Sequence, residues 1–156
     1  MHEVCVTHDF NFSQEQVFAG ISHHVEFLST STIQCRLVRT GDADPNGLGA
    51  LREVRNGMLR FEEGITAFES PHAYEYRILA LRGPFNLKLP FHHKHGRLEL
   101  HCIDGKTRLE WTTRFQVSVP FIGRWIERKL GSSISATFVF FLKRLDARLQ
   151  ESSSHT

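Results

Sequence analysis

The segment PFIGRWIERKLGSSISATFVFFLKRLDARLQE, residues 120–151, decides the fold of this chain. Its apolar residues recur in steps of three and four, the spacing that places side chains on one face of an α-helix. They are Ile122, Ile126, Leu130, Ile134, Phe138, Phe141, Leu142, Leu145 and Leu149. Pro120 suits a first helical turn, where its missing N–H needs no partner. The spacing predicts a helix about 45 Å long, whose apolar face a large partner must cover.

Small residues gather in the middle of this helix. Gly131 predicts a bend there, and the residues that follow it include Ser132, Ser133, Ser135, Ala136 and Thr137. Such residues could leave a cavity between the helix and its cover, or they could allow a strand to approach closely. Periodicity alone leaves both interpretations open.

Composition predicts an ordinary soluble domain over residues 1–151, followed by a polar tail at residues 152–156. The chain is 40% hydrophobic and 23% charged. Its formal net charge of +2, without a long basic run, gives no support to nucleic-acid binding. No run of apolar residues is long enough for a membrane span, and no signal peptide is recognisable. Three separated cysteines predict reduced thiols and a cytoplasmic location: Cys5, Cys35 and Cys102.

The rest of the chain reads as strands with two short helices near its start. Alternation over residues 3–12 predicts the first strand. Ser13, with Gln16 three residues later, predicts a capping box that opens helices over residues 17–21 and 25–28. Hairpin signals occur at Asn56-Gly57 and Asp104-Gly105. Six further strands are predicted, over Ile33–Thr40, Ala50–Arg55, Leu59–Glu69, Ala73–Leu81, Leu98–Ile103 and Thr107–Val119.

These elements predict an α+β architecture, in which one antiparallel sheet packs on a single long helix. A strongly twisted sheet of about seven strands curls around such a helix. Because the small residues of the helix cannot fill the hollow, the hollow is the default site for an apolar ligand.

Several short segments, in the same order, point to a known family. They are SQEQVF (13–18), GLGALREV (47–54), EEGIT (62–66), SPHAYEY (70–76) and GKTRLEW (105–111), followed by the terminal helix. Together they resemble the helix-grip fold of the START and birch-pollen-allergen superfamily (SRPBCC), and within it the polyketide cyclase/dehydrase and lipid-transport family. The resemblance implies a hydrophobic ligand cavity. It implies no reaction, because the superfamily holds enzymes, carriers and binding modules.

Arg52 and Glu63 are expected on apolar faces of neighbouring strands. If those faces are concave, the two charges must pair, because a buried charge needs a partner. The pair could orient a ligand or serve acid–base chemistry, or it could be a structural ion pair at the rim. A shift of one residue in register would place both in solvent. Tyr74 and Tyr76 share a face, and a buried phenol there needs a hydrogen-bond partner, which a ligand could supply.

The expected ligand-binding residues combine these polar groups with apolar walls. They are Arg52, Phe61, Glu63, Tyr74, Tyr76, Trp111, Phe115, Ile134, Thr137, Phe138 and Phe141. Trp111 and Phe115 are expected to be core or cavity wall. In an enzyme, Arg52, Glu63 and Tyr76 would be the catalytic candidates. No nucleophile elbow, P-loop or dinucleotide motif is recognisable, and no cofactor is expected.

A histidine cluster invites a metal hypothesis, with members His92, His93, His95 and His101. On an unbroken strand, His93, His95 and His101 share one face. That face is opposite Leu98 and Leu100 and is therefore the solvent face. No carboxylate or cysteine has ligand spacing. The sequence therefore predicts solvated histidines and no metal site.

The loop GPFNLKLPF (83–91) places apolar residues at alternate positions, namely Phe85, Leu87, Leu89 and Phe91. An exposed apolar hairpin could be a portal over the cavity or a surface that touches membranes transiently. It could equally be an edge strand with one buried face. The sequence leaves these alternatives open.

The leading functional hypothesis is binding or transport of a hydrophobic small molecule, such as a lipid, polyketide or isoprenoid, by a monomer or weak homodimer. The alternative is an enzyme, a polyketide cyclase/aromatase or dehydratase. A third hypothesis is a protein-interaction module that uses the sheet edge or the outer face of the helix, where Val139 and Phe140 lie.

Overall fold

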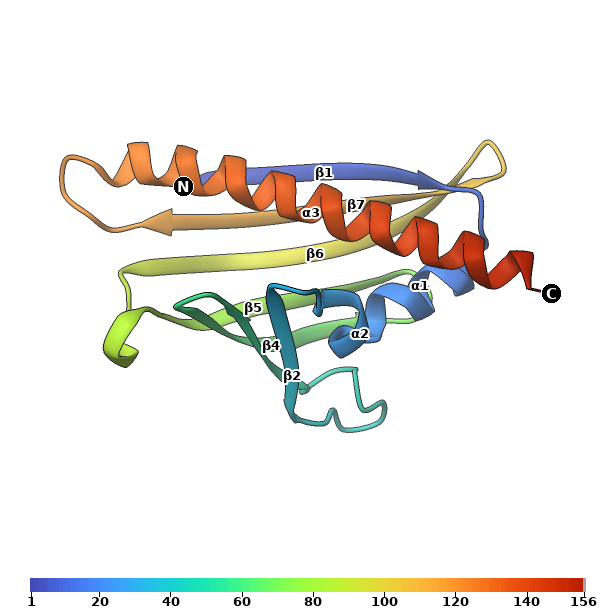
Figure 1. Cartoon of the computed structure of the whole chain (residues 1–156), viewed down its shortest axis with the longest axis horizontal. Helices are drawn as coiled ribbons and strands as arrows, with labels where there is room; N and C mark the ends of the chain where they lie inside the picture. The colour runs from blue at the N-terminus through green and yellow to red at the C-terminus, as the bar shows by residue number, and fades with distance from the viewer. Residues whose placement is uncertain (156) are drawn as a thin grey trace.

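The structure, a computed structural model, describes residues 1–155 and contains the predicted antiparallel sheet with a long helix across it (Figure 1). Seven strands follow the order β1-β7-β6-β5-β4-β3-β2. They are β1 (His2–Phe10), β2 (Ile33–Arg39), β3 (Leu51–Asn56), β4 (Leu59–Glu69), β5 (Ala73–Arg82), β6 (Phe91–Ile103) and β7 (Lys106–Val117). The helices are α1 (Gln14–Ser22), α2 (His24–Leu28) and α3 (Gly123–Ser154), with a short 3-10 helix η1 (Pro84–Asn86).

Local signals in the sequence determine the turns and the first helix. Asp104 and Gly105 have φ angles of 51° and 76°, as a tight two-residue hairpin turn requires, and Gly57 has a φ of 60°. The Ser13 side chain accepts a hydrogen bond from the Gln16 N–H, and the Gln16 side chain accepts one from the Ser13 N–H. The predicted hairpins and capping box are therefore confirmed.

Helix α3 begins at Gly123 rather than at Pro120. Phe121 has a φ of 68°, which no helical turn accepts, so the chain turns sharply after β7. The Glu127 carboxylate accepts a hydrogen bond of 2.9 Å from the Val117 N–H and ties the helix to the end of β7. A Cβ atom on Gly123 would lie 2.7 Å from the Val117 carbonyl oxygen, so this close approach requires glycine. These two tertiary contacts with Val117 determine that the helix starts at Gly123.

At its other end, α3 continues to Ser154, which is three residues into the predicted polar tail. Residue 156, the last of that tail, lies outside the described residues. The bend predicted at Gly131 is wrong, because α3 is one uninterrupted helix. Gly131 is instead buried where the His2 imidazole packs on the helix. Its missing side chain serves close approach of β1, which was the second interpretation of the small residues.

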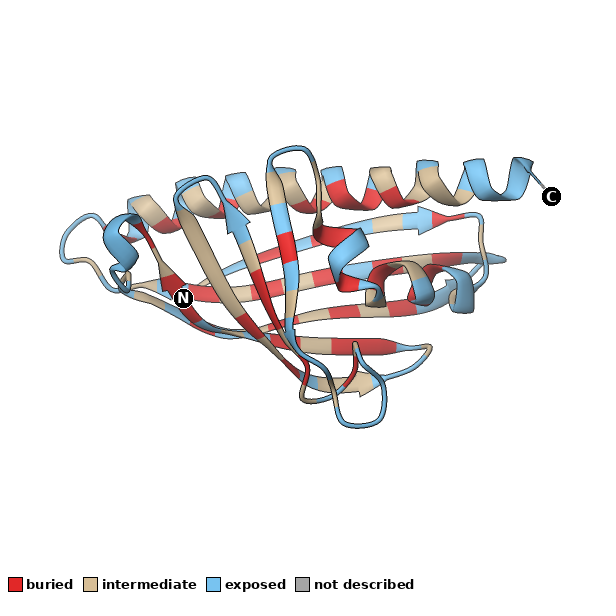
Figure 2. Cartoon of the chain, turned by 60° about the horizontal axis from the view of Figure 1, so that its bottom comes forward, coloured by how far each residue is buried: buried red, intermediate tan, exposed pale blue. Residues whose placement is uncertain are grey.

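The hydrophobic core lies under the C-terminal half of α3, where the helix, α1 and α2 meet the sheet (Figure 2). Its members from α3 are Phe138, Phe141, Leu142 and Leu145, all buried. Along the N-terminal half the stripe is only partly covered, since Ile126, Leu130 and Ile134 are half-buried and Ile122 is exposed. The sheet and helix therefore separate toward one end. No helix within residues 1–155 combines the length and apolarity that a membrane crossing needs.

Candidate functional site

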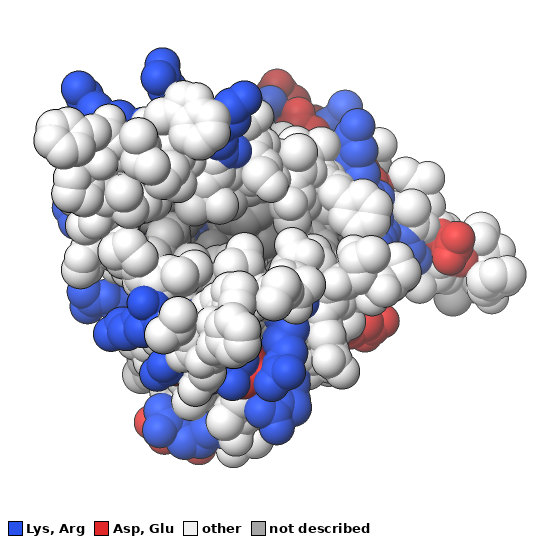
Figure 3. All heavy atoms as spheres, turned by 60° about the vertical axis from the view of Figure 1, so that its left-hand side comes forward, with Lys and Arg blue, Asp and Glu red and all other residues white. Residues whose placement is uncertain are grey.

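A cavity of about 160 Å³ lies between the concave face of the sheet and the N-terminal half of α3. It is visible as a hollow in the end of the molecule that carries η1 and the turn between β7 and α3 (Figure 3). Ten of the eleven expected residues line it, namely Arg52, Phe61, Glu63, Tyr76, Trp111, Phe115, Ile134, Thr137, Phe138 and Phe141. Further walls come from Leu28, Ile33, Val54, Asn56, Leu59, Ile78, Phe91, Thr113, Leu130 and Ser133.

Arg52 and Glu63 form a buried ion pair at the inner end of the cavity. They lie directly opposite each other on β3 and β4. The Arg52 Nε donates a hydrogen bond of 2.6 Å to the Glu63 Oε2, and the two residues are 1% and 7% exposed. Both side chains thus project from the inner face, where the strand alternation places them, and each neutralises the other.

His24, which the sequence analysis missed, completes this polar group. Its Nδ1 accepts a hydrogen bond of 2.8 Å from the Arg52 Nη1, so its Nε2 carries the proton and donates to the Asn46 carbonyl at 2.8 Å. Burial, reinforced by the Arg52 charge, lowers the pKa of His24 to about 3, which keeps the ring neutral. One signal was present: His24, Phe27 and Leu28 have helical spacing and share the buried face of α2.

The two predicted tyrosines have different positions. Tyr74 does not line the cavity, because it lies behind Arg52, where its hydroxyl donates to the Ile21 carbonyl at 3.2 Å. Tyr76 lines the cavity, and its ring centre is 4.9 Å from the Arg52 Cζ. Burial raises the pKa of the Tyr76 hydroxyl, so the phenol remains protonated. That hydroxyl accepts a hydrogen bond of 3.1 Å from the Trp111 Nε1.

His93 is buried, so the prediction of solvated histidines is wrong for this member of the cluster. The pairing of β6 with β7 shifts between His93 and His95, and this bulge at Lys94 turns His93 to the inner face. Its Nδ1 accepts the Ile78 N–H at 2.9 Å, so its Nε2 donates to the Thr113 Oγ1 at 2.8 Å. Burial lowers the pKa of His93 to about 4.

The other histidines of the cluster remain at the surface, since His92 and His101 are exposed and His95 is half-buried. Within residues 1–155, no three His, Cys, Asp or Glu side chains come together as a metal site would require.

Tyr76 and Thr113 therefore present hydroxyl protons to the cavity. Each hydroxyl oxygen already accepts a hydrogen bond, from the Trp111 Nε1–H and the His93 Nε2–H respectively. Within residues 1–155, neither hydroxyl proton has an acceptor of its own. The two residues occupy one row across the sheet, separated by Gly96 of β6. A Cβ atom on Gly96 would collide with the Tyr76 ring, so glycine lets the ring lie across β6.

The loop over residues 83–91 is neither an alternating hairpin nor an edge strand. It lies between the interior strands β5 and β6, and η1 interrupts the alternation. Phe85 and Leu87 are 96% and 63% exposed, Leu89 is half-buried, and Phe91 lines the cavity. The predicted portal group is therefore divided between the surface and the cavity wall.

A family model described as polyketide cyclase / dehydrase and lipid transport matches residues 1–150. A comparison with curated proteins finds no match.

Solved structures share the fold. A protein from Thermus thermophilus is similar at a TM-score of 0.75 and 14% identity, with 97% of this chain and 99% of that chain covered. A Mycobacterium smegmatis protein reaches a TM-score of 0.69 at 11% identity, with 96% and 92% covered. Ara h 8.0201 reaches 0.64 at 12% identity, with 92% and 97% covered. The family match spans nearly all of the chain, and the protein therefore belongs to the polyketide cyclase/dehydrase and lipid-transport family of the SRPBCC superfamily.

Proposed function

We propose that the protein binds or carries a hydrophobic small molecule in the cavity between sheet and α3. The supporting observation is the pair of hydroxyl donors, Tyr76 and Thr113, in an otherwise largely apolar wall. A buried polar group without a partner is unfavourable, and a ligand oxygen could accept both protons. The ligand we propose is thus an apolar molecule that carries a hydrogen-bond acceptor, such as a carbonyl oxygen.

The size of the cavity restricts the ligand further. About 160 Å³ is comparable to a cavity that holds one benzene ring. One ring or a short chain segment would fill the enclosed part. A longer lipid, polyketide or isoprenoid would extend through the open end, past Phe91 and Leu130.

An enzyme of the polyketide cyclase/aromatase or dehydratase type is the second candidate. Tyr76 favours it, because a protonated phenol that lacks an acceptor can polarise a substrate carbonyl. Binding remains the stronger proposal, since the other titratable groups are committed to each other. The Glu63 carboxylate holds Arg52, and the imidazoles of His24 and His93 use both of their nitrogens.

Two further properties belong to this proposal. The three cysteines are free thiols, which supports a reducing, cytoplasmic location. We also propose that the protein acts as a monomer or weak homodimer, since the cavity is complete within one chain. Sedimentation velocity over a range of protein concentrations tests the oligomeric state.

The test of the binding proposal compares two ligands of the same shape. Isothermal titration calorimetry should show that acetophenone binds about two- to tenfold more tightly than ethylbenzene, because only the ketone accepts a hydrogen bond. Tyr76→Phe should reduce this preference, because only the Thr113 donor remains, while ethylbenzene affinity stays near its original value. Equal affinity of the two compounds for the unaltered protein would contradict the donor assignment, and binding of neither would contradict the cavity proposal.

A cavity-filling substitution tests the location. Thr137 lines the cavity from α3, so Thr137→Phe should abolish binding of both compounds while thermal stability stays level or rises. Thr137→Val keeps the size of the side chain and serves as the control. If the site were packed core, Thr137→Phe would instead destabilise the protein by about 1–3 kcal/mol.

A further inference from the structure

Apolar side chains project into solvent around the opening of the cavity. Phe85 and Leu87 are 96% and 63% exposed, and Phe121 and Trp125 are 106% and 56% exposed. The loop that contains η1 and the segment that leads from β7 into α3 lie at the same end of the molecule in Figure 1. They are joined by a hydrogen bond of 2.9 Å from the Ser118 N–H to the Pro90 carbonyl. We call this end, residues 83–90 and 118–129, the mouth face.

Single exposed apolar residues are ordinary, but a group around a hollow marks an interaction site. Two of these exposed side chains lie on left-handed backbone, since Phe85 and Phe121 have φ angles of 58° and 68°. Asn86, beside Phe85, accepts hydrogen bonds from Arg60 at 2.7 Å and Arg82 at 3.3 Å. The exposed phenylalanine is therefore held on an ordered loop.

The mouth face is also basic, although the net charge of the whole chain is only +2. Lys88, Arg124, Arg128 and Lys129 are exposed on it. Residues 83–90 contain Lys88 and no Asp or Glu. Between residues 111 and 145 the one acidic residue is Glu127, which is buried. Figure 3 shows Lys and Arg side chains around the apolar rim of the hollow.

We propose that the mouth face docks on the surface of an anionic lipid bilayer. Exposed aromatic and aliphatic tips enter the interfacial region, while the lysines and arginines contact lipid phosphates. The cavity opening then faces the membrane, so that an apolar molecule can pass between bilayer and cavity without crossing water. Docking itself does not depend on what the cavity binds.

Charge and shape favour this partner over two others. In a symmetric contact between two copies, the basic mouth faces would repel each other. Single-stranded nucleic acid stacks its bases on aromatic rings along a groove. Here Leu87 and Ile122, exposed at 63% and 52%, are aliphatic and cannot stack, whereas they can enter hydrocarbon.

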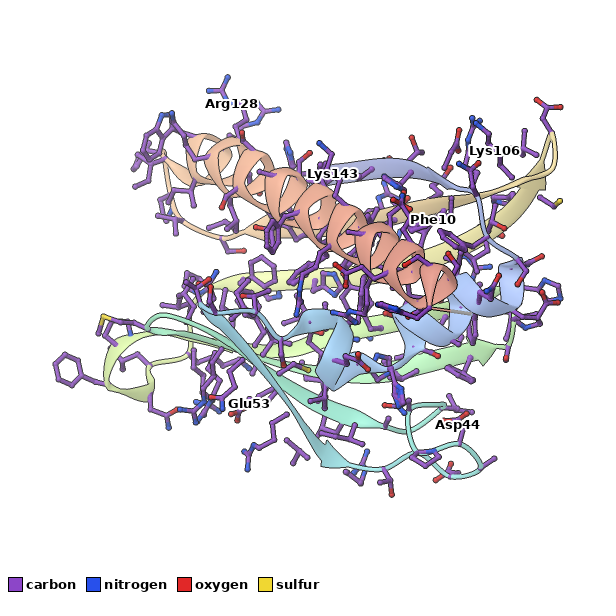
Figure 4. The ribbon with its side chains drawn as sticks, turned by 45° about the vertical axis from the view of Figure 1, so that its right-hand side comes forward. Phe10, Asp44, Glu53, Lys106, Arg128 and Lys143 are labelled. Carbon is purple, nitrogen blue, oxygen red and sulfur yellow. The ribbon has the colours of Figure 1, made fainter. Side chains whose placement is uncertain are left out.

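Vesicle flotation tests the proposal with two matched pairs of variants. Arg128 and Lys143 are both exposed on α3, but only Arg128 belongs to the mouth face (Figure 4). Arg128→Glu should weaken binding to vesicles containing phosphatidylglycerol by more than tenfold, since each unit of charge changes affinity about fivefold. Lys143→Glu should leave binding near that of the unaltered protein. Trp125→Ser should weaken it about tenfold, whereas Phe140→Ser, at a site 53% exposed on the same helix, should not.

Fluorescence gives a second reading of the same contact. Trp125 and Trp111 are the two tryptophans, and Trp111 is 2% exposed. Vesicles with brominated acyl chains should quench Trp125 emission in the bound protein. Concentrated NaCl should release the protein, because it shortens the Debye length from about 10 Å to about 3 Å between 0.1 M and 1 M salt.

Three outcomes would overturn the proposal. One is failure to float with anionic vesicles, and another is equal losses in Arg128→Glu and Lys143→Glu. The third is that the protein self-associates or binds single-stranded DNA, and that Arg128→Glu and Trp125→Ser abolish this binding but leave vesicle binding unaffected.

Discussion

Lowering the pH from 7 to 5 should remove about 4 kcal/mol from the free energy of unfolding, because the fold buries two neutral histidines. His24 and His93 are 0% and 5% exposed. Both act as hydrogen-bond acceptors through Nδ1, from Arg52 and from the Ile78 N–H. A proton on Nδ1 would break these bonds and place a charge in the protein interior.

The magnitude follows from the two pKa values. Burial lowers the pKa of His24 from 6.5 to about 3 and that of His93 to about 4. The unfolded chain therefore binds more protons than the folded protein below pH 6.5. The stabilisation is complete above that pH and is lost as the pH falls toward the folded pKa values. Each histidine contributes about 1.4 kcal/mol per pH unit in this window, or about 2 kcal/mol between pH 7 and pH 5.

Urea unfolding followed by circular dichroism at pH 7 and pH 5 measures the effect. Asn presents an oxygen near the position of Nδ1, so His24→Asn and His93→Asn should each reduce the pH-dependent loss by about 2 kcal/mol. His92→Asn, at the exposed neighbouring position, is the control and should leave the loss unchanged. Paired carboxylates do not contribute between pH 7 and pH 5. The hydrogen bond from Arg55 lowers the pKa of Glu53, for example, so its stabilisation is lost only below about pH 4.5. A loss of less than about 1 kcal/mol in the unaltered protein would refute the reasoning.

Two further substitutions test the geometry of the site. Arg52→Met leaves Glu63 buried without its partner and should lower the free energy of unfolding, measured in urea, by about 3–5 kcal/mol. Adding Glu63→Leu to this variant should recover most of that loss. No recovery in the double variant would contradict a buried ion pair. Gly96→Ala places a methyl group against the Tyr76 ring and should cost about 1–3 kcal/mol and weaken ketone binding. Gly64→Ala, whose Cβ would lie 3.6 Å from Leu79, is the matched control, and an equal cost in both variants would exclude the proposed contact.

Patterns with a short range in sequence predicted most of the fold. The period of two in the strands brought Arg52 and Glu63 together on the inner face, because seven strands pair with few interruptions. The residues at Asn56-Gly57 and Asp104-Gly105 determined where the chain reverses. The twist of a seven-stranded sheet predicted that it curls around the helix, and the family resemblance pointed to the same fold.

The features that could not be predicted depend on contacts between distant segments. A single bulge at Lys94 moves His93 from the solvent face to the inner face of the sheet, where it contacts Thr113, and no residue pattern marks it. Helix α3 starts late because Glu127 binds the end of β7, a contact that overrides the preference of Pro120 for a first turn. His24 gains its role only when α2 packs against β2 and brings the imidazole within hydrogen-bond distance of Arg52 on the neighbouring strand β3.

Native mass spectrometry of the protein, expressed in bacterial cells and purified without detergent, tests the central claim most directly. The cavity proposal predicts a noncovalent complex with an apolar small molecule at one copy per chain, released as the bare protein on collisional activation. Thr137→Phe, purified in parallel, should appear only at the mass of the bare chain. Bare-chain mass for both proteins, before and after incubation with acetophenone, would contradict a ligand-binding cavity.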